Sequence, residues 1–322
     1  MQVHFWGTRG SLPASMTTKT IETKIFKAIQ ASRSFKLDTD AAIQTFIRNE
    51  LSFSVRGSYG GNTACVEITN EPEYILCDAG TGLRDFGQQY MKARAGGHKS
   101  LPDVFNIFIS HLHWDHIQGF PFFTPAFIPG NRINIYGYHT ALEDTFVRQQ
   151  EAPCFPVPLR AMKADISFQV LETGRVYDIA GVKVTGVEQL HPGDSYGYCF
   201  LKEGKKIVYS TDSEHKKEDA GDDQCRFVEF FKNADLLVFD AQYSFLDAVD
   251  TKENWGHSSN LLGVELAMRA GVRRLCLFHH EHTFDDEALD RFLGDTRKYL
   301  NILDSSSGME IYLAYDGLTV RI

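Results

Sequence analysis

Long hydrophobic runs are missing from this 322-residue sequence, since none approaches the ~18–20 apolar residues that a bilayer span requires. The first ten residues, MQVHFWGTRG, lack the basic and then apolar pattern of a secretory signal. The six cysteines lie far apart without a CxxC pair, which predicts free thiols in a reducing compartment. These absences predict a cytoplasmic protein without a membrane partner.

Basic residues are also scarce, with 33 Lys and Arg against 42 Asp and Glu and a net charge of −9. Such a chain lacks the broad basic surface of proteins that hold duplex DNA or RNA by the phosphates, so a large nucleic acid is a less favoured partner. A small anionic substrate stays compatible, because a bound metal ion reverses the local field. The sequence has no GxxxxGK[ST] motif, so it does not indicate nucleotide triphosphate hydrolysis of the P-loop kind.

Short runs of β-branched and aromatic residues, bounded by Gly, Pro and Asn, recur along the chain with helical patterns between them. The predicted strands are residues 2–6, 64–69, 73–78, 104–110, 133–136, 181–187, 197–202, 205–210, 235–240, 273–278 and 310–315, and the predicted helices are residues 82–94, 223–233, 259–270 and 285–300. This α/β alternation predicts a sheet sandwich covered by helices, with residues 1–322 forming one domain.

Residues 14–58 differ from their surroundings and are predicted to form a two-helix insertion. Apolar residues recur every four positions from Ile21 to Ile29, and a second apolar stripe begins near Ile43, where Asp38 or Thr39 can cap the helix. Three interpretations are open: a surface hairpin packed on the domain, a lid over the active site, or a homodimer contact.

The strongest motif is the segment His111-Leu112-His113-Trp114-Asp115-His116, directly after an apolar strand. Four adjacent ionisable side chains at a strand end are costly to bury without a partner, and a metal ion supplies that partner. His111 and His113 point the same way on an extended segment, so they can share one ion, while Asp115 and His116 face a second. Imidazole and carboxylate ligands suit zinc, with manganese or iron as alternatives.

This motif resembles that of the metallo-β-lactamase superfamily, whose members carry HxHxDH after a strand. The resemblance implies a four-layer αββα sandwich and three further ligands, His191, Asp212 and His279, with His280 as the second choice for the last position. It assigns His111, His113 and His191 to one ion, Asp115, His116 and His279 to the other, and Asp212 as the bridge. Two ions held in this way activate water as the nucleophile.

The segment Trp255-Gly256-His257-Ser258-Ser259 resembles the histidine motif of the superfamily's phosphodiesterase branch, which includes tRNA 3′-processing endonucleases and small-molecule phosphodiesterases. The resemblance implies that His257 faces the scissile phosphate, so Asp115 and His257 are the predicted catalytic residues. The alternative is that Ser258 or Ser259 caps a helix and His257 is incidental. The turn around Asp78 resembles one that places a hydrogen-bond acceptor beneath the metals.

These features together predict a binuclear metal-dependent phosphodiesterase for a small phosphodiester, above all a cyclic nucleotide or cyclic phosphate. The stretch 137–180 is neither glycine-rich nor strongly basic, unlike the tRNA-clamping arm of the endonucleases. Phe155, Pro156 and Val157 are expected to wall a substrate pocket beside Trp114 and Trp255. The alternatives are an RNA 3′-endonuclease, an ester, thioester or lactone hydrolase, and a non-catalytic sensor or interaction protein.

Overall fold

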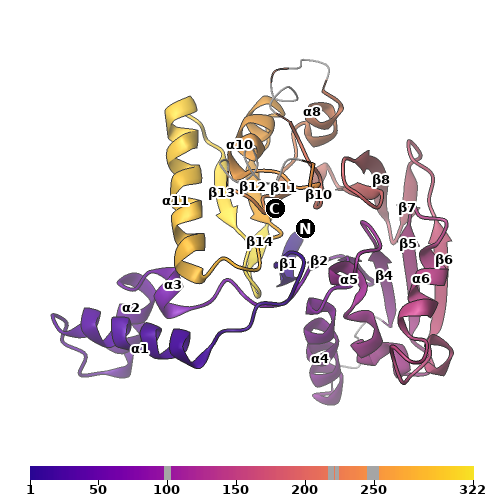
Figure 1. The fold of residues 1–322 in the computed structure, drawn as a ribbon, viewed down its shortest axis with the longest axis horizontal. Coiled ribbons are helices and arrows are strands. Elements are labelled where there is room, and N and C mark those ends of the chain that lie inside the picture. The colour runs from indigo at the N-terminus through magenta and orange to yellow at the C-terminus, as the bar shows by residue number, and fades with distance from the viewer. Residues whose placement is uncertain (98–102, 217–220, 222–224, 245–253) are drawn as a thin grey trace.

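The computed structural model describes residues 1–97, 103–216, 221, 225–244 and 254–322. Two seven-stranded mixed sheets face each other, with helices on their outer faces (Figure 1). The first sheet has the order β14 (Thr319–Arg321), β1 (Gln2–Gly7), β2 (Cys65–Ile68), β3 (Tyr74–Cys77), β4 (Val104–Phe108), β5 (Arg132–Gly137) and β6 (Asp165–Val170). The second has the order β13 (Glu310–Leu313), β12 (Arg274–Phe278), β11 (Leu236–Asp240), β10 (Lys205–Ser210), β9 (Ser195–Lys202), β8 (Val182–Gln189) and β7 (Tyr177–Ile179).

Three apolar clusters hold the layers together. Phe5 and Phe108 of the first sheet meet Phe200 and Phe278 of the second in a central cluster from which water is excluded. A second cluster lies between the first sheet and α4 (Gly82–Ala95). The third packs the second sheet against α8 (Arg226–Phe231), α10 (Asn260–Arg269) and α11 (Asp286–Leu303). The predicted αββα sandwich is therefore confirmed.

Burial on both faces explains why the central strands are continuous apolar runs. All five residues of β11, Leu-Leu-Val-Phe-Asp, are buried, as expected for a strand covered on both sides. Strands β10 to β13 are parallel to one another, as are β3 to β6. Parallel strands end at the same edge of a sheet, so the residues that follow β3, β4, β10, β11 and β12 gather at one end of the sandwich.

All eleven predicted strands occur, and no boundary shifts by more than two residues. The sequence reading missed three strands at sheet edges, β6, β7 and β14, and the helix α6 (Leu142–Gln149). An edge strand is half exposed and its apolar pattern is weak, as in β6, where no residue is fully buried. Predicted helix 223–233 corresponds to α8, while residues 223–224 lie outside the described residues.

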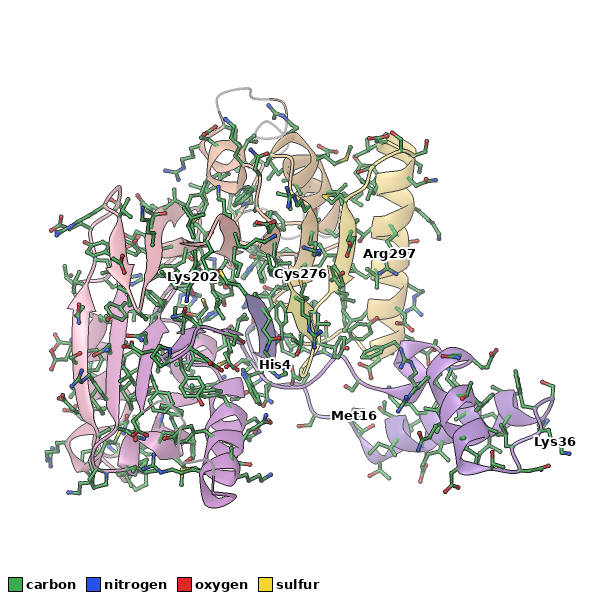
Figure 2. All side chains as sticks on the ribbon, turned by 180° about the vertical axis from the view of Figure 1, so that it is seen from behind. His4, Met16, Lys36, Lys202, Cys276 and Arg297 are labelled. Carbon is green, nitrogen blue, oxygen red and sulfur yellow. The ribbon has the colours of Figure 1, made fainter. Side chains whose placement is uncertain are left out.

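The residues between β1 and β2 form the two expected helices, α1 (Thr18–Ser32) and α2 (Asp40–Asn49), and a short third helix, α3 (Phe53–Arg56). Thr39 caps α2 by accepting a hydrogen bond from the backbone N–H of Ala42, as predicted. The hairpin of α1 and α2 projects from the sandwich beside the lower end of α11 (Figure 1), with Met16 at its root and Lys36 near its tip (Figure 2). Lys24 anchors it through a 2.6 Å ion pair with Asp286.

One face of the hairpin is apolar and exposed. No residue of α1 is buried, and Phe46 is the one buried residue of α2. The exposed apolar side chains are Ile21, Ile25, Phe26, Ile29, Ile43 and Ile47. The hairpin therefore does not use this face to cover the sandwich. Among the described residues, no helix combines the length and apolar character that crossing a membrane requires.

Candidate metal centre

The predicted ligands converge at the end of the sandwich where the central strands terminate. His111 and His113 follow β4, and Asp115 and His116 lie in the short helix α5 (Trp114–Ile117). The remaining three follow β8, β10 and β12 and are His191, Asp212 and His279. The fold thus brings together all seven side chains from four separate segments.

One group consists of His111, His113 and His191, whose ligand atoms all lie within 4.8 Å of one another. His191 Nε2 lies 3.2 Å from His113 Nδ1. His111 is fully buried, and its Nε2 has no hydrogen-bond partner among the described residues. A buried nitrogen without a partner costs about 1–3 kcal/mol, so this atom is suited to an ion.

A second group consists of Asp115, His116 and His279, again within 4.8 Å. The Nε2 atoms of His116 and His279 lie 3.2 Å apart, and each is 3.2 Å from Asp115 Oδ2. Two imidazole nitrogens and a carboxylate oxygen pointing at one small volume match the donor set that zinc prefers.

Asp212 lies between the two groups, where a bridge is expected. Its Oδ1 is 3.7 Å from His111 Nε2 and 3.9 Å from His191 Nε2. Its Oδ2 is 3.3 Å from His116 Nε2 and 3.4 Å from His279 Nε2. Each carboxylate oxygen therefore faces one group. The seven residues fit a pair of divalent cations in chemistry and placement.

The charges of the cluster are strongly coupled. Burial opposes ionisation of Asp212, but the surrounding histidines, His279 and His116 foremost, hold its pKa well below the usual range. Burial also opposes ionisation of Asp115, but the neighbouring His116 outweighs this effect and holds the pKa of Asp115 well below its usual range. Burial lowers the pKa of His111, which favours the neutral imidazole that a metal ion needs. The cluster thus presents anionic carboxylates beside the neutral ring of His111, and against the effect of burial these carboxylates raise the pKa of His116 and of His279.

Asp78 supports the centre from below. Its Oδ2 lies 2.7 Å from His116 Nδ1, and it accepts hydrogen bonds from the backbone N–H of Ser110 at 2.7 Å and from Tyr209 OH at 2.7 Å. With Nδ1 of His116 engaged, Nε2 faces the cluster. His191 is oriented in the same way, with Nδ1 2.8 Å from the carbonyl oxygen of Gly256.

Three residues of the site share a left-handed backbone. Asp78, Asp212 and His279 have φ values of 60°, 51° and 60°, and each follows the end of a strand. This conformation is uncommon outside glycine and is concentrated at functional sites. His280 was the second choice for the last ligand, and its φ is not left-handed. Its Nε2 lies 2.7 Å from the carbonyl oxygen of Ala314, away from the cluster.

Glycines pack against the candidate ligands where a larger side chain has no room. A Cβ on Gly10 would lie 2.6 Å from His279 Nδ1, and one on Gly256 would lie 2.3 Å from His191 Nδ1. Next to Gly10, the backbone N–H of Ser11 donates to Asp115 Oδ2 at 2.8 Å. The turn after β1 is therefore part of the site.

His257 lies beside the seven residues. Its ring centre is 5.0 Å from that of His191 and 5.1 Å from that of His279. Its Nδ1 lies 2.8 Å from Asp240 Oδ2 and 3.9 Å from Asp212 Oδ1. Ser259 does cap α10, through the N–H of Leu262, so the capping alternative holds for that serine while His257 faces the centre.

Asp240 was missed by the sequence analysis. It is fully buried and accepts 3.1 Å hydrogen bonds from the backbone N–H groups of Ser213 and Gln242. The available signal was the sequence DLLVFD, in which a carboxylate ends an otherwise apolar strand. That signal is weak, since such a residue also occurs in ordinary turns.

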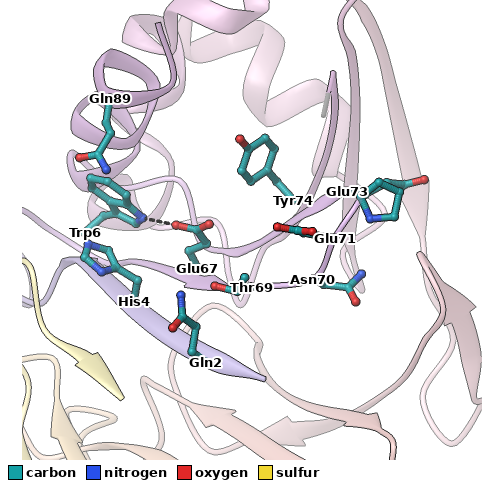
Figure 3. Close-up of a pocket in the computed structure, with 11 residues that line it drawn as sticks. Gln2, His4, Trp6, Glu67, Thr69, Asn70, Glu71, Glu73, Tyr74 and Gln89 are labelled. Atoms are coloured by element: carbon teal, nitrogen blue, oxygen red, sulfur yellow. Dashed lines mark hydrogen bonds between the residues drawn. The ribbon is translucent and has the colours of Figure 1, made fainter. Parts of the chain in front are cut away.

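A cavity of about 520 Å³ lies away from the candidate centre, against β1, β2 and β3 of the first sheet (Figure 3). It is lined by Tyr74, the first residue of β3, whereas the candidate centre adjoins Asp78, beyond the last residue of that strand. Trp6 Nε1 donates to Glu67 Oε2 there at 2.9 Å. None of the seven candidate ligands lines this cavity, so its size does not mark it as the metal site.

Comparison with known proteins agrees with the fold. A family described as "Beta-lactamase superfamily domain" matches residues 73–280. A protein named Ribonuclease Z from Natronomonas pharaonis is 26% identical over 309 residues, covering 81% of this chain and 92% of its own. The crystal structure of human tRNase Z, short form, matches with a TM-score of 0.60 and 21% identity, covering 100% of this chain and 99% of that one. The metallo-beta-lactamase fold protein YhfI from Bacillus subtilis matches with a TM-score of 0.61 and 17% identity, covering 99% and 98%.

Proposed function

Because the chain belongs to the beta-lactamase superfamily, we propose that it is a hydrolase of phosphodiesters that depends on two divalent metal ions. The observation that carries this proposal is the pair of ligand groups facing the two oxygens of Asp212, with His257 beside them. Nitrogen and oxygen donors favour zinc, and manganese or iron also accept them. The free state of all six cysteines supports a reducing, cytoplasmic setting.

In this proposal His111, His113 and His191 hold one ion, Asp115, His116 and His279 hold the other, and Asp212 contacts both. Bound divalent ions supply Lewis acidity and lower the pKa of water, so that a nucleophile is available at neutral pH. Asp78 fixes the ring of His116, and Ser11 fixes the carboxylate of Asp115. The chain thus sets the position of the reacting groups before substrate arrives.

His257 is proposed to assist the leaving group. Water attacks phosphorus, the bond from phosphorus to the ester oxygen breaks, and His257 gives a proton to that departing oxygen. Asp240 accepts from Nδ1 of the ring, which leaves Nε2 to carry the transferred proton. The water that attacks loses a proton to solvent, and His257 is reprotonated from solvent, so the cycle balances.

The preferred substrate class is a small phosphodiester such as a cyclic nucleotide. Two observations support it: the net charge of −9, and the compact structure of the stretch 137–180, where α6 and a turn-rich segment lead directly to β6. RNA 3′-end cleavage is the second candidate, and the similarity to proteins named Ribonuclease Z favours it.

Hydrolysis assays on the metal-reconstituted protein test the proposal. Bis(p-nitrophenyl) phosphate, cyclic nucleotides, a precursor tRNA with a 3′ extension, and a lactone are compared at equal protein concentration. We expect chelator-sensitive turnover of bis(p-nitrophenyl) phosphate and of a cyclic nucleotide. Turnover of the lactone alone assigns the chain to ester chemistry, and precursor cleavage with strong salt dependence assigns it to RNA. Absence of turnover on all four contradicts an enzymatic function.

A further inference from the structure

A cavity of about 500 Å³ adjoins the candidate metal centre, within the size range of small-molecule sites. It lies between the segment that carries the HxHxDH motif and the end of α6. The residues that matter for its chemistry are Leu112, Trp114, Phe122, Arg148, Gln149 and Phe155. Phe155 was expected to line a pocket beside Trp114 and does so, whereas Pro156, Val157 and Trp255 do not line this one.

The cavity shares a wall with the metal centre. Leu112 and Trp114 alternate along the chain with the candidate ligands His111, His113 and Asp115. Leu112 precedes α5 and Trp114 begins it, so the cavity and four of the candidate ligands are built from the same segment, residues 111–116. The segment that carries the HxHxDH motif therefore forms one side of this cavity.

The walls are aromatic and unusually open to solvent. Trp114 is 80% exposed and Phe122 is 56% exposed. Phe155 stands edge-on to Phe122, with ring centres 5.5 Å apart. Exposed apolar side chains that adjoin one another mark interaction sites or ligand-binding grooves, because they gain free energy when a ligand covers them. Flat rings are the natural ligands of such walls.

Polar groups complete the cavity. Gln149 Nε2 is buried and has no hydrogen-bond partner among the described residues. A buried donor of this kind is costly unless a ligand supplies an acceptor. Arg148 is exposed, and its side chain forms neither an ion pair nor a hydrogen bond with any described residue. One donor and one cation beside aromatic rings suit a flat, acceptor-bearing ring attached to a phosphate.

We propose that this cavity binds the nucleobase of the nucleotide that carries the scissile phosphate, which makes Trp114 a specificity-determining residue. The inference rests on the proposed function. The base stacks on Trp114, its ring acceptors meet Gln149, and Arg148 lies over the ring or near a phosphate. The substrate class is then a nucleotide ester rather than a phosphodiester of any alcohol.

Two synthetic esters with the same leaving group test the inference. Thymidine 5′-(p-nitrophenyl phosphate) carries a base, and methyl p-nitrophenyl phosphate does not. We expect the wild-type protein to prefer the thymidine ester in kcat/KM, and Trp114→Ala to reduce this preference by roughly 5- to 100-fold, mainly through KM, as one stacking contact predicts. Trp114→Phe should restore much of it, and the control Ile302→Ala, at an exposed site on α11, should leave it unchanged.

Calorimetry gives a second measurement that needs no turnover. Wild-type protein should bind thymidine 5′-monophosphate more tightly than deoxyribose 5-phosphate, and Gln149→Leu and Trp114→Ala should each reduce that difference. Equal affinity of the wild type for both ligands overturns the inference, as does a preference that survives both substitutions. Hydrolysis of the methyl ester without any preference for thymidine refutes the pocket while the proposed function stands. Absence of hydrolysis of both esters counts against the function, and the calorimetry then decides the pocket alone.

Discussion

Asp240 Oδ2 lies 2.8 Å from Nδ1 of His257, and this contact joins the end of β11 to the segment before α10. Asp240 is itself fixed by two backbone N–H groups, from Ser213 and Gln242. A carboxylate held in this way fixes the orientation of the histidine ring. The pair has the arrangement of a proton donor with its orienting partner.

We expect His257→Ala to lower kcat by roughly 10²- to 10⁴-fold, the usual size of an acid–base contribution. Asp240→Asn should lower it by roughly 10- to 100-fold, because the ring keeps its place but loses its charged partner. Steady-state kinetics and elemental analysis are measured on the same samples. His257, Asp240 and His279 also present ligand atoms within 4.8 Å of one another, so a loss of metal in His257→Ala would identify a ligand rather than a proton donor.

The seven-residue centre predicts close to two transition-metal ions per chain in gently purified or reconstituted protein. Asp212→Ala and His116→Ala should abolish turnover while the circular dichroism spectrum stays unchanged, because the three apolar clusters do not depend on these side chains. His4→Gln is a matched control, since His4 contacts Thr319 far from the centre. A metal content that stays below one ion per chain after reconstitution would contradict the two-ion arrangement.

Gly10→Ala tests whether the turn after β1 positions His279. The new Cβ would lie 2.6 Å from His279 Nδ1, which is closer than real contacts allow, so the ring must move. Gly10 has no positive φ, so alanine adds the clash without added backbone strain. We expect metal affinity to fall roughly tenfold or more. Gly294→Ala, where nothing lies within 4 Å of the added Cβ, is the control, and equal metal binding in the two variants would refute the role of Gly10.

A buried histidine outside the centre predicts acid sensitivity. Burial lowers the pKa of His215 to about 3, and its ring stacks on Phe239 with centres 5.3 Å apart. His215 is therefore neutral in the folded protein, while the unfolded chain binds a proton below about pH 6.5. The free energy of unfolding should fall as pH drops from 6.5 towards 3, by about 2 kcal/mol at pH 5.

Denaturant unfolding of wild-type protein and His215→Phe, both in chelator, measures this contribution. The variant should show a shallower decline in stability between pH 6.5 and 5. Parallel pH profiles would exclude His215 as the source.

The hairpin of α1 and α2 is expected to affect substrate access or oligomerisation and not metal binding. Replacing residues 14–58 by a short Gly/Ser linker should leave metal content unchanged, since the insertion supplies none of the seven candidate ligands. A changed KM or substrate range supports a lid, and conversion of a dimer to a monomer supports an assembly contact. Ile25→Asp with Ile29→Asp, on the exposed face, tests the second case without a deletion. Loss of both ions from a folded deletion variant would show the expectation to be wrong.

Local sequence patterns were sufficient to predict most of the fold and many residues of the candidate site. The central strands are apolar on both faces, so each strand end and the polar residue after it could be located, as for His111 and Asp212. Asp240 could not be recognised, because its role depends on His257, which reaches it from a different segment. The exposure of the hairpin was also unpredictable. Apolar stripes at helical spacing indicate a face that needs a cover, and they do not say whether the same chain supplies it.

The turn that leads into the hairpin also contacts the candidate metal centre, since the backbone N–H of Ser11 donates to Asp115 and Gly10 packs against His279. Binding free energies at two coupled sites are reciprocal. Displacement of Ser11 would therefore release a hydrogen bond to Asp115, and ions at the centre would in turn hold this turn in place by the same free energy. The turn after β1, and not the hairpin beyond it, links the first strand to the occupancy of the centre.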